Sequence, residues 1–193
     1  MKETLDVMDV PWIPQASFLF LDAIVQPALK VFEYGSGGST IYFARKSCKL
    51  VAIEHDRDWF EAVQAKLQSY SISGVDLRFV PPEEQNIGTD NSDPAHYYEP
   101  PCTGNYQRYV STIDEFRQAS FDIILVDGTA RPSCLQHAFL RVKPGGYLIL
   151  DNSERPYYLA QVEHPLKRWE RYTFWGHGPI NPYMWECTIW KRP

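Results

Sequence analysis

The sequence predicts an α/β fold in which helices cover both faces of a mostly parallel sheet, forming a three-layer sandwich. Apolar runs of strand length alternate five times with segments of helical periodicity, a pattern typical of parallel strands joined by crossover helices. The run FDIILVDG at 121–128 is almost entirely apolar, as expected for a strand that is buried on both faces. A length of 193 residues suits one domain with a sizeable core, so we predict a single domain over 1–193.

The first 80 residues predict three helices that alternate with three strands. We expect an N-terminal helical segment over 1–29, helices at 17–29, 39–46 and 57–69, and strands at 30–34, 50–53 and 75–80. Leu21 and Ile24 fall on one face of the first helix. Ser39 can cap the free N–H groups at the start of the second helix. Val63 and Leu67 belong to the inward stripe of the third helix, which is amphipathic.

Residues 81–110 are rich in Pro, Asp, Asn and Tyr and show no periodicity, so they predict a long loop inserted after the third strand. Long loops within compact domains are uncommon and often act as lids over functional sites. The alternative is a mobile excursion on the surface. We expect a lid whose Tyr97, Tyr98 and Arg108 side chains line a pocket for a polar, ring-shaped substrate.

The second half of the chain continues the alternation and ends in two strands. We expect helices at 112–118, 132–142 and 155–163, strands at 121–128, 147–152, 171–175 and 185–190, and a turn at 144–146. Leu135 and Phe139 lie on the inward face of the helix at 132–142. A loop rich in Gly, Pro and Asn joins the last two strands, which we therefore expect to be antiparallel to each other.

Polar side chains stand at the carboxyl ends of four predicted strands. They are Glu33, Glu54, Asp127 and the pair Asp151-Asn152. Ligands of open α/β sheets bind at the carboxyl ends of the strands, at the point where the strand order reverses. The sequence therefore predicts a ligand site at this edge of the sheet, built from four distant stretches of chain.

The stretch FEYGSGGST at 32–40 places three glycines directly after the first strand. Glycines allow a sharp turn and a close approach of the backbone to a ligand, and the helix that follows directs free N–H groups to the same place. A purely structural tight turn is the alternative interpretation. Dinucleotide sites use the same device, but their GxGxxG pattern needs a glycine at position 40, where Thr40 stands.

Two carboxylates indicate which ligand the turn suits. Glu33 stands just before the glycines, where it would repel a pyrophosphate and attract a cationic amine. Glu54 follows 21 residues later at the end of the second strand and can accept hydrogen bonds from both hydroxyls of a ribose. A ribose together with a positive group, and no phosphate, describes S-adenosylmethionine.

Four segments of the chain, FEYGSGGST, AIEHD, FDIILVDG and VKPGGYLILDN, resemble in this order the motifs of class I S-adenosylmethionine-dependent methyltransferases. The resemblance covers about residues 30–152. It implies a seven-stranded sheet in which one strand near the C-terminus is antiparallel. The PGG turn before the fifth strand is a feature of this family and is not expected in a dehydrogenase.

The resemblance also implies roles for single residues. It gives the methionine part of the cofactor to Glu33 and the turn, the ribose to Glu54, and the surroundings of the adenine to His55 or Asp56. Asp127 should face the methionine end or the substrate. The cofactor contacts that we expect are Glu33, Tyr34, Gly35, Ser36, Gly37, Ser39, Thr40, Glu54, His55 and Asp127.

Asp127, Asp151 and Asn152 also match the magnesium ligands of the catechol O-methyltransferase-like group. A hard cation with oxygen ligands can bind two vicinal hydroxyls and lower the pKa of the one that attacks. The resemblance to that group therefore implies a Mg²⁺ site at these three residues. Turn formation at a strand end is the alternative role for Asp151 and Asn152.

The lysine that serves as the base in that group has no counterpart in the stretch from Asp127 to Arg131. Arginine is a poor base because it stays protonated. Either the metal ion alone activates the hydroxyl, or another group accepts the proton, for which His177 and Asp127 are the candidates. A lone His177 also suits a surface position. Arg131 and Arg155 follow the fourth and fifth strands, where each can bind an acidic or sugar-like substrate or pair with a surface carboxylate.

Composition excludes several classes of protein. A net charge of −5 argues against a general nucleic-acid-binding protein, which needs surplus cations. The apolar stretch 16–32 is interrupted by Asp22 and Lys30, so it does not predict a membrane span. Four cysteines without a CxxC pair, and an acidic N-terminus without a signal-peptide pattern, predict a cytoplasmic protein.

These features together predict an S-adenosylmethionine-dependent methyltransferase that methylates an oxygen of a small polar acceptor, such as a sugar, a glycan precursor or a secondary metabolite. An NAD-dependent oxidoreductase on a similar sheet and a non-catalytic S-adenosylmethionine-binding protein are the alternatives. The expected partners are a small-molecule substrate and no nucleic acid or membrane. The sequence leaves open whether the chain forms a homodimer.

Overall fold

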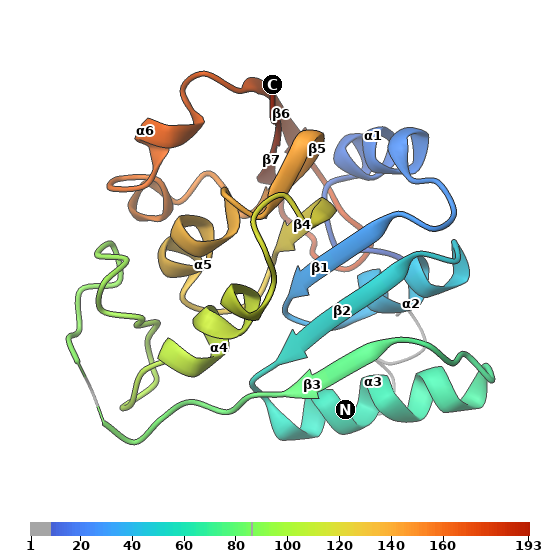
Figure 1. Cartoon of the computed structure of the whole chain (residues 1–193), viewed down its shortest axis with the longest axis horizontal. Coiled ribbons are helices and arrows are strands. Elements are labelled where there is room, and N and C mark those ends of the chain that lie inside the picture. Colours follow the sequence, from blue (N-terminus) through green and yellow to red (C-terminus); the bar gives the residue numbers. More distant parts are fainter. Residues whose placement is uncertain (1–8, 86) are drawn as a thin grey trace.

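The protein contains a seven-stranded sheet with helices on both faces, seen in a computed structural model that describes residues 9–85 and 87–193 (Figure 1). The strand order is β3-β2-β1-β4-β5-β7-β6. The strands are β1 (Lys30–Tyr34), β2 (Lys49–Glu54), β3 (Asp76–Phe79), β4 (Phe121–Val126), β5 (Val142–Asp151), β6 (Glu170–Gly176) and β7 (Trp185–Lys191). Strands β1 to β5 pair in parallel, whereas β7 is antiparallel to both of its neighbours. The predicted fold class, with one antiparallel strand near the C-terminus, is confirmed.

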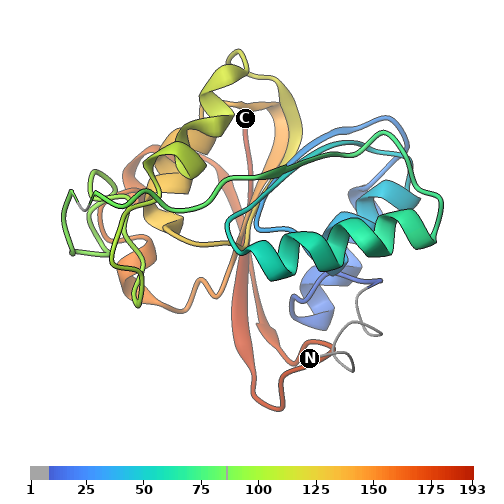
Figure 2. The same ribbon diagram turned by 90° about the horizontal axis from the view of Figure 1, so that it is seen from below.

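Helices form the two outer layers of the sandwich (Figures 1 and 2). One layer contains α1 (Gln15–Ile24), α2 (Gly38–Arg45) and α3 (Arg57–Ser69). The other contains α4 (Gln107–Ser111), α5 (Arg131–Ala138) and α6 (Glu163–Leu166), with the 3₁₀ helices η2 (Thr112–Glu115) and η3 (Pro156–Tyr158). Within the part of the chain that the structure describes, no helix is long and apolar enough to cross a bilayer.

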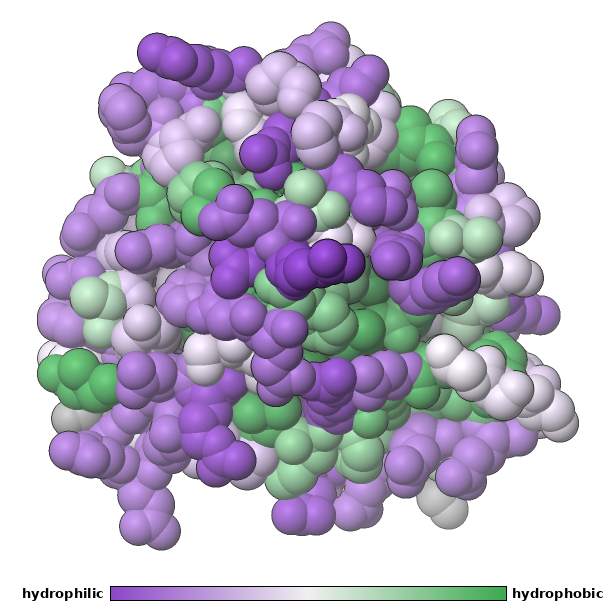
Figure 3. All heavy atoms as spheres, viewed as in Figure 1, coloured by the Kyte–Doolittle hydropathy of each residue, from purple (hydrophilic) through white to green (hydrophobic). Residues whose placement is uncertain are grey.

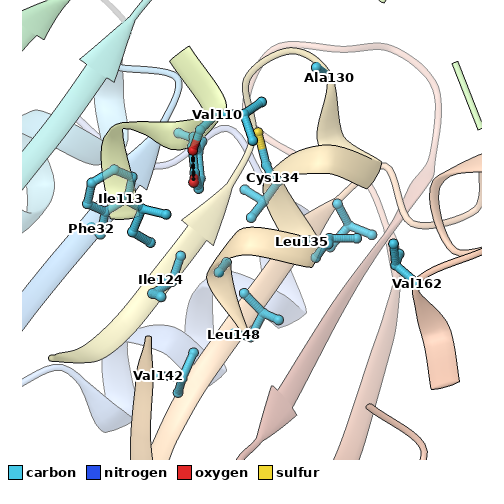
Figure 4. Packing of buried hydrophobic residues seen from close by; sticks show 14 of the residues in the cluster. Phe32, Val110, Ile113, Ile124, Ala130, Cys134, Leu135, Val142, Leu148 and Val162 are labelled. Carbon is cyan, nitrogen blue, oxygen red and sulfur yellow. Dashed lines mark hydrogen bonds between the residues drawn. The ribbon is translucent and has the colours of Figure 1, made fainter. Parts of the chain in front are cut away.

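The buried strands supply side chains alternately to the two helical layers. Val31, Ile123 and Ile149 pack on the side of α1 and α2. Phe32 and Ile124, together with Leu148 and residues of α5, form the core on the other side (Figure 4). Because both faces of the central strands are covered, their sequences are continuously apolar. On the face shown in Figure 3, polar residues predominate and apolar ones reach the surface in separate groups.

Three helices are shorter than the sequence predicts. The first helix ends at Ile24 instead of residue 29, because Pro27 disfavours helical geometry in the residue before it. The helix predicted at 132–142 ends at Ala138, and Val142 already belongs to β5. The helix predicted at 155–163 is replaced by η3 and the four-residue α6.

Strand β5 begins earlier than predicted and includes the stretch 144–146 that we expected to form a turn. Its pairing with β4 shifts register between Phe121 and Ile123, which accommodates the irregular backbone. Gly145 adopts a φ of 77° within this irregularity. The prediction was wrong here because a bulged strand and a turn share the same Pro-Gly-Gly signal.

The two ends of the segment 81–110 are held together by backbone hydrogen bonds. Glu83 and Asn105 form an isolated antiparallel bridge, with N–O distances of 2.8 and 3.1 Å. Helix α4 begins at Gln107, inside the predicted loop, and η2 replaces the helix predicted at 112–118. The described residues between these points, 84–85 and 87–104, project beside α4 and α5 (Figures 1 and 2). Its role as a lid stays a prediction.

Gly35 directly follows β1 and packs against Gly128, which lies just after β4. Its φ is +88°, and a Cβ added there would lie 2.7 Å from Gly128 Cα. We expect Gly35→Ala to lower the free energy of unfolding by about 2–5 kcal/mol, from backbone strain and overpacking together. Gly74→Ala is a matched control, because Gly74 has a φ of +86° but open space around it, and it should cost about 1 kcal/mol. Equal losses in denaturant titrations of the two variants would contradict a close contact between Gly35 and Gly128.

Candidate active site

A cavity of about 790 Å³ lies at the carboxyl ends of the strands. It borders the point between β1 and β4 where the strand order reverses, as expected for a ligand site in this architecture. Its lining residues come from the N-terminal segment, the β1–α2 turn, the start of α3, the ends of β2, β4 and β5, and the β6–β7 connection. They are Trp12, Gly35, Ser36, Glu54, His55, Asp56, Asp58, Trp59, Ala62, Asp127, Gly128, Asp151, Asn152, Arg155, Asn181, Tyr183 and Trp185.

Glu33 supports the glycine turn from below and is not among the residues that line this cavity. The side chain is fully buried. Thr40 Oγ1 donates to Glu33 Oε2 over 2.6 Å and accepts from the N–H of Gly37 over 2.9 Å, so Glu33 and Thr40 hold the turn that opens α2. Burial raises the pKa of Glu33 to about 8, although hydrogen bonds from Ser39 and Thr40 oppose the shift. A direct contact between Glu33 and a ligand stays a prediction.

The raised pKa of Glu33 predicts a pH-dependent stability. A carboxyl group whose pKa rises from 4.5 to about 8 on folding stabilises the fold fully below pH 4.5, and this contribution is lost as the pH rises through 8. Between pH 5 and 9 the wild type should therefore lose about 4 kcal/mol relative to Glu33→Gln. Denaturant titrations at several pH values measure this difference. Glu61→Gln, at an exposed carboxylate of α3, is the control and should follow the wild type.

Glu54 ties the end of β2 to the glycine turn. Its Oε2 accepts from the N–H and hydroxyl of Ser36 over 2.9 and 3.1 Å. Its Oε1 accepts from the N–H groups of His55 and Asp56 over 2.8 and 2.9 Å. Burial opposes the ionisation of Glu54, but these contacts and the His55 ring outweigh it and lower its pKa. Glu54 is thus a charged carboxylate on the cavity wall, next to the turn.

Aromatic rings form one side of the cavity. Trp59 Nε1 donates to the carbonyl of Ser36 over 2.5 Å, which fixes the indole against the glycine turn. Trp12 packs against Trp59 edge to face, with ring centroids 5.5 Å apart. His55 packs against Tyr106 and Tyr109 on the side of α4. Apolar ring faces beside a few polar groups are typical of small-molecule sites.

Asp127 and Asp151 form a pair of carboxyl groups at the ends of β4 and β5. Burial raises the pKa of Asp127, and a hydrogen bond with Asp151 and the charge of Arg131 partly offset this. Burial and repulsion from Asp127 raise the pKa of Asp151 well above its ordinary value. Asp151 Oδ1 accepts from Trp185 Nε1 over 2.8 Å. Burial and mutual repulsion therefore disfavour the charged form of Asp151 more than that of Asp127, whose side chain is 23% exposed and lines the cavity.

Arg131 occupies the position that the sequence assigned to a metal ion. Its guanidinium donates to Asp127 Oδ1 over 3.2 Å and to Asn152 Oδ1 over 3.1 Å, and also to the backbone carbonyl of Asp151. A cation bound there would compete with a guanidinium for the same oxygen atoms. The described residues contain no cluster of three or more His, Cys, Asp or Glu side chains suited to a metal. The geometry of these three residues therefore gives no support to the predicted Mg²⁺ site.

The predicted substrate residues are distributed over different parts of the molecule. Arg155 lines the cavity, and its guanidinium donates to the hydroxyl of Tyr158 over 2.8 Å. Arg131 is buried, and its guanidinium donates hydrogen bonds to backbone carbonyls of neighbouring residues. The described part of the segment 81–110, which includes Tyr97, Tyr98 and Arg108, contributes no residue to the cavity lining. Arg108 is exposed on α4, so a role for these three in substrate binding has no support in the geometry.

Two more predicted site residues lie elsewhere. His177 is exposed and lines a separate cavity of about 290 Å³ beside the start of α1, where its carbonyl accepts from the N–H of Gln15. It is therefore not placed to accept a proton in the large cavity. Tyr34 is fully buried in the core, and its hydroxyl donates to the carbonyl of Val110 over 2.7 Å.

Sequence reasoning missed several residues of the cavity wall. Trp12, Trp59 and Tyr183 carry no motif, and only the packed chain shows that they meet there. Trp185 had a usable signal, because an antiparallel partner for the fifth strand must run past its carboxyl end. In the structure Cys187 pairs with Asp151, which brings Trp185 beside the carboxyl group.

Comparisons with known proteins identify the fold. No family model and no curated protein matches the sequence. Solved structures do match, among them an O-methyltransferase from Bacillus cereus in complex with SAH (16% identity, TM-score 0.66, 99% of this chain and 88% of that one). A methyltransferase-like protein from Silicibacter pomeroyi has 22% identity and a TM-score of 0.59 over 97% of this chain and 91% of that one. An rRNA methylase from Streptococcus thermophilus has 13% identity and a TM-score of 0.60 over 92% of this chain and 95% of that one. At these identities the likeness shows that this chain has the fold of those methyltransferases.

Proposed function

We propose that this protein is a methyltransferase that transfers the methyl group of S-adenosylmethionine to an oxygen of a small polar acceptor. One observation carries the proposal: the glycine turn, Glu54 and Asp127 meet around one cavity at the point where the strand order reverses. The likeness to solved methyltransferases supports the reaction class. Their printed descriptions include both an O-methyltransferase and an rRNA methylase, so the acceptor has to be argued from this chain.

The cavity suits the cofactor in size and in charge. Its volume of about 790 Å³ lies in the range of small-molecule sites. Gly35 leaves the backbone bare beside the cavity, and Glu54 stands at the end of β2, where a ribose is bound in related sheets. The carboxylates of Glu54 and Asp127 favour a ligand that carries positive charge. S-adenosylmethionine supplies a methyl group activated by a sulfonium.

Asp127 is the residue that we assign to proton transfer. Burial raises its pKa, which makes its carboxylate form a stronger base than that of an exposed aspartate. The Arg131 guanidinium, which donates to Asp127 Oδ1 over 3.2 Å, holds the carboxylate in a fixed orientation. A hydroxyl of the acceptor can give its proton to Asp127 as the oxygen attacks the methyl carbon.

Arg155, Asn181 and Tyr183 form the part of the cavity that we assign to the acceptor, because they lie on its β5 and β6–β7 side. Arg155 offers a guanidinium, Asn181 an amide and Tyr183 a phenol, and these groups can form hydrogen bonds with a small polar molecule. The net charge of −5 disfavours a nucleic-acid acceptor. All four cysteines are free thiols, which supports a place in the reducing cytoplasm.

Calorimetry with S-adenosylmethionine, S-adenosylhomocysteine and NAD tests the class of cofactor. We expect binding of the first two and none of NAD. Transfer of a labelled methyl group to a panel of sugars, phenols and RNA then tests the acceptor. Binding of NAD alone would indicate an oxidoreductase, binding without transfer to any acceptor would indicate a non-catalytic protein, and labelling of RNA would refute the small-molecule acceptor.

A further inference from the structure

Arg131 is enclosed by oxygen atoms at the carboxyl ends of β4 and β5. Only 9% of its side chain is exposed. Nε donates to the carbonyl of Gly128 over 2.9 Å, and one terminal nitrogen donates to the carbonyl of Asp151 and to Asn152 Oδ1. The other terminal nitrogen donates to the carbonyl and to Oδ1 of Asp127 over 3.1 and 3.2 Å. All five N–H groups of the guanidinium therefore have an acceptor.

The position of Arg131 follows from the local chain. It is the first residue of α5, and it follows Ala130, whose φ of 48° reverses the chain direction after the β4 strand end. This turn brings the guanidinium back beneath Asp127, four residues earlier. Tyr158 covers its far side, with the guanidinium carbon 5.3 Å from the ring centroid. The side chain has no freedom to reach into the cavity as a substrate ligand.

A divalent cation at this place would compete with the guanidinium of Arg131 for Asp127 Oδ1 and Asn152 Oδ1, and its charge would be repelled by that guanidinium. Magnesium and calcium are bound in proteins through oxygen ligands, with carboxylates prominent among them. Here Asp127 Oδ1 and Asn152 Oδ1 accept from Arg131, and Asp151 Oδ1 accepts from Trp185. A planar guanidinium supplies the positive charge that these groups require and fixes their orientation at the same time.

We infer that Arg131 takes the place of a metal ion in this site, as a built-in cation that positions Asp127 and Asn152 and makes methyl transfer independent of divalent cations. Arg131 acts through Asp127 and is a positioning residue, because it lies beneath the cavity wall. The inference rests on the proposed function for its kinetic test, whereas its cation-binding test is independent of that function.

The first experiment titrates the wild-type protein with Mn²⁺ and follows the free ion by electron paramagnetic resonance. We expect no stoichiometric Mn²⁺ site, and an affinity for S-adenosylhomocysteine that does not change when a chelator is added. A one-to-one Mn²⁺ site that disappears in Asp151→Ala would overturn the inference. A wild type that binds no S-adenosylhomocysteine would refute the proposed function but leave the Mn²⁺ result valid.

The second experiment compares Arg131→Ala with Arg168→Ala, an exposed arginine between α6 and β6. We expect Arg131→Ala to lower turnover about 100-fold, as for a misplaced catalytic group, with a much smaller change in cofactor affinity. Guanidinium chloride at low millimolar concentration should restore turnover severalfold, whereas Arg168→Ala should match the wild type with or without it. Wild-type turnover in Arg131→Ala, or a loss that guanidinium does not relieve, would overturn the inference.

If Arg131→Ala does not fold, Arg131→Lys provides the test. Lysine keeps the charge but has no fork of five donors, so it cannot hold Asp127 and Asn152 together. We expect a folded protein with normal cofactor affinity, turnover lowered about tenfold or more, and still no Mn²⁺ site. Turnover equal to that of the wild type would show that positioning by the guanidinium is not needed.

Discussion

An Asp127→Asn substitution should lower the rate of methyl transfer about 1,000-fold, within the usual range for loss of a general base, and change the affinity for S-adenosylhomocysteine by less than about threefold. An amide cannot take the proton of the acceptor hydroxyl. The change is otherwise nearly isosteric, and the amide oxygen can still accept from Arg131. Single-turnover rates with saturating cofactor measure the chemical step, and calorimetry measures the affinity.

The pH profile provides a second readout for Asp127. A base must be ionised, so the wild-type rate should fall as the pH drops below the pKa of Asp127, which burial raises above its ordinary range. The residual rate of Asp127→Asn should lack this limb. Asp58→Asn removes one charge from the same cavity without touching the carboxyl pair, and it should keep the acidic limb. A profile that is unchanged in Asp127→Asn would exclude Asp127 as the base.

A Glu54→Gln substitution should weaken the binding of S-adenosylhomocysteine about 100-fold, equivalent to about 2.7 kcal/mol. The carboxylate accepts from four protein donors, and the amide of glutamine would turn a donor toward some of them. The link between β2 and the glycine turn should therefore loosen, and the charged partner for a ribose is lost. Calorimetry on the variant, with its fold checked by circular dichroism, measures the change.

The pKa of Glu54 gives the sign of the pH effect. Because this pKa is lowered in the fold, the contribution of the carboxylate is present above the unfolded value of 4.5 and is lost as the pH falls through the lower folded value. Binding should therefore stay constant from neutral pH down to mildly acidic pH. Glu54→Asp retains the charge but shortens the side chain, so it should bind more tightly than Glu54→Gln. Equal affinity in the wild type and Glu54→Gln would remove Glu54 from the cofactor site.

The fold was predictable wherever the local sequence pattern directly reflects the burial of a segment in the folded protein. The central strands are covered on both faces, so their apolar runs mark them without ambiguity. The glycine turn was also predictable from the sequence, because the close contact between Gly35 and Gly128 leaves no room for a side chain. The ends of the helices were harder to predict. Pro27 stops α1 early, and the Pro-Gly-Gly stretch lies in a bulged strand instead of a turn.

The candidate site was predictable in its carboxylates but not in its cations. Parallel strands place their carboxyl ends together, so Glu54, Asp127 and Asp151 had to share an edge. Whether an arginine faces a substrate or a neighbouring carboxylate depends on the turn that carries it. The left-handed residue Ala130 directs Arg131 back beneath Asp127, and an alanine gives no sequence signal for that conformation.

Strand β7 enters the sheet between β5 and β6, although it follows both of them along the chain. Strand β6 pairs only with β7, so it has no place in the sheet until the later strand has arrived. The same strand carries Trp185 to the carboxyl group of Asp151. The strand that closes the sheet therefore also supplies the hydrogen-bond donor of Asp151. A nascent chain that has not yet incorporated β7 presents an unpaired β5 edge and an Asp151 carboxyl group without Trp185.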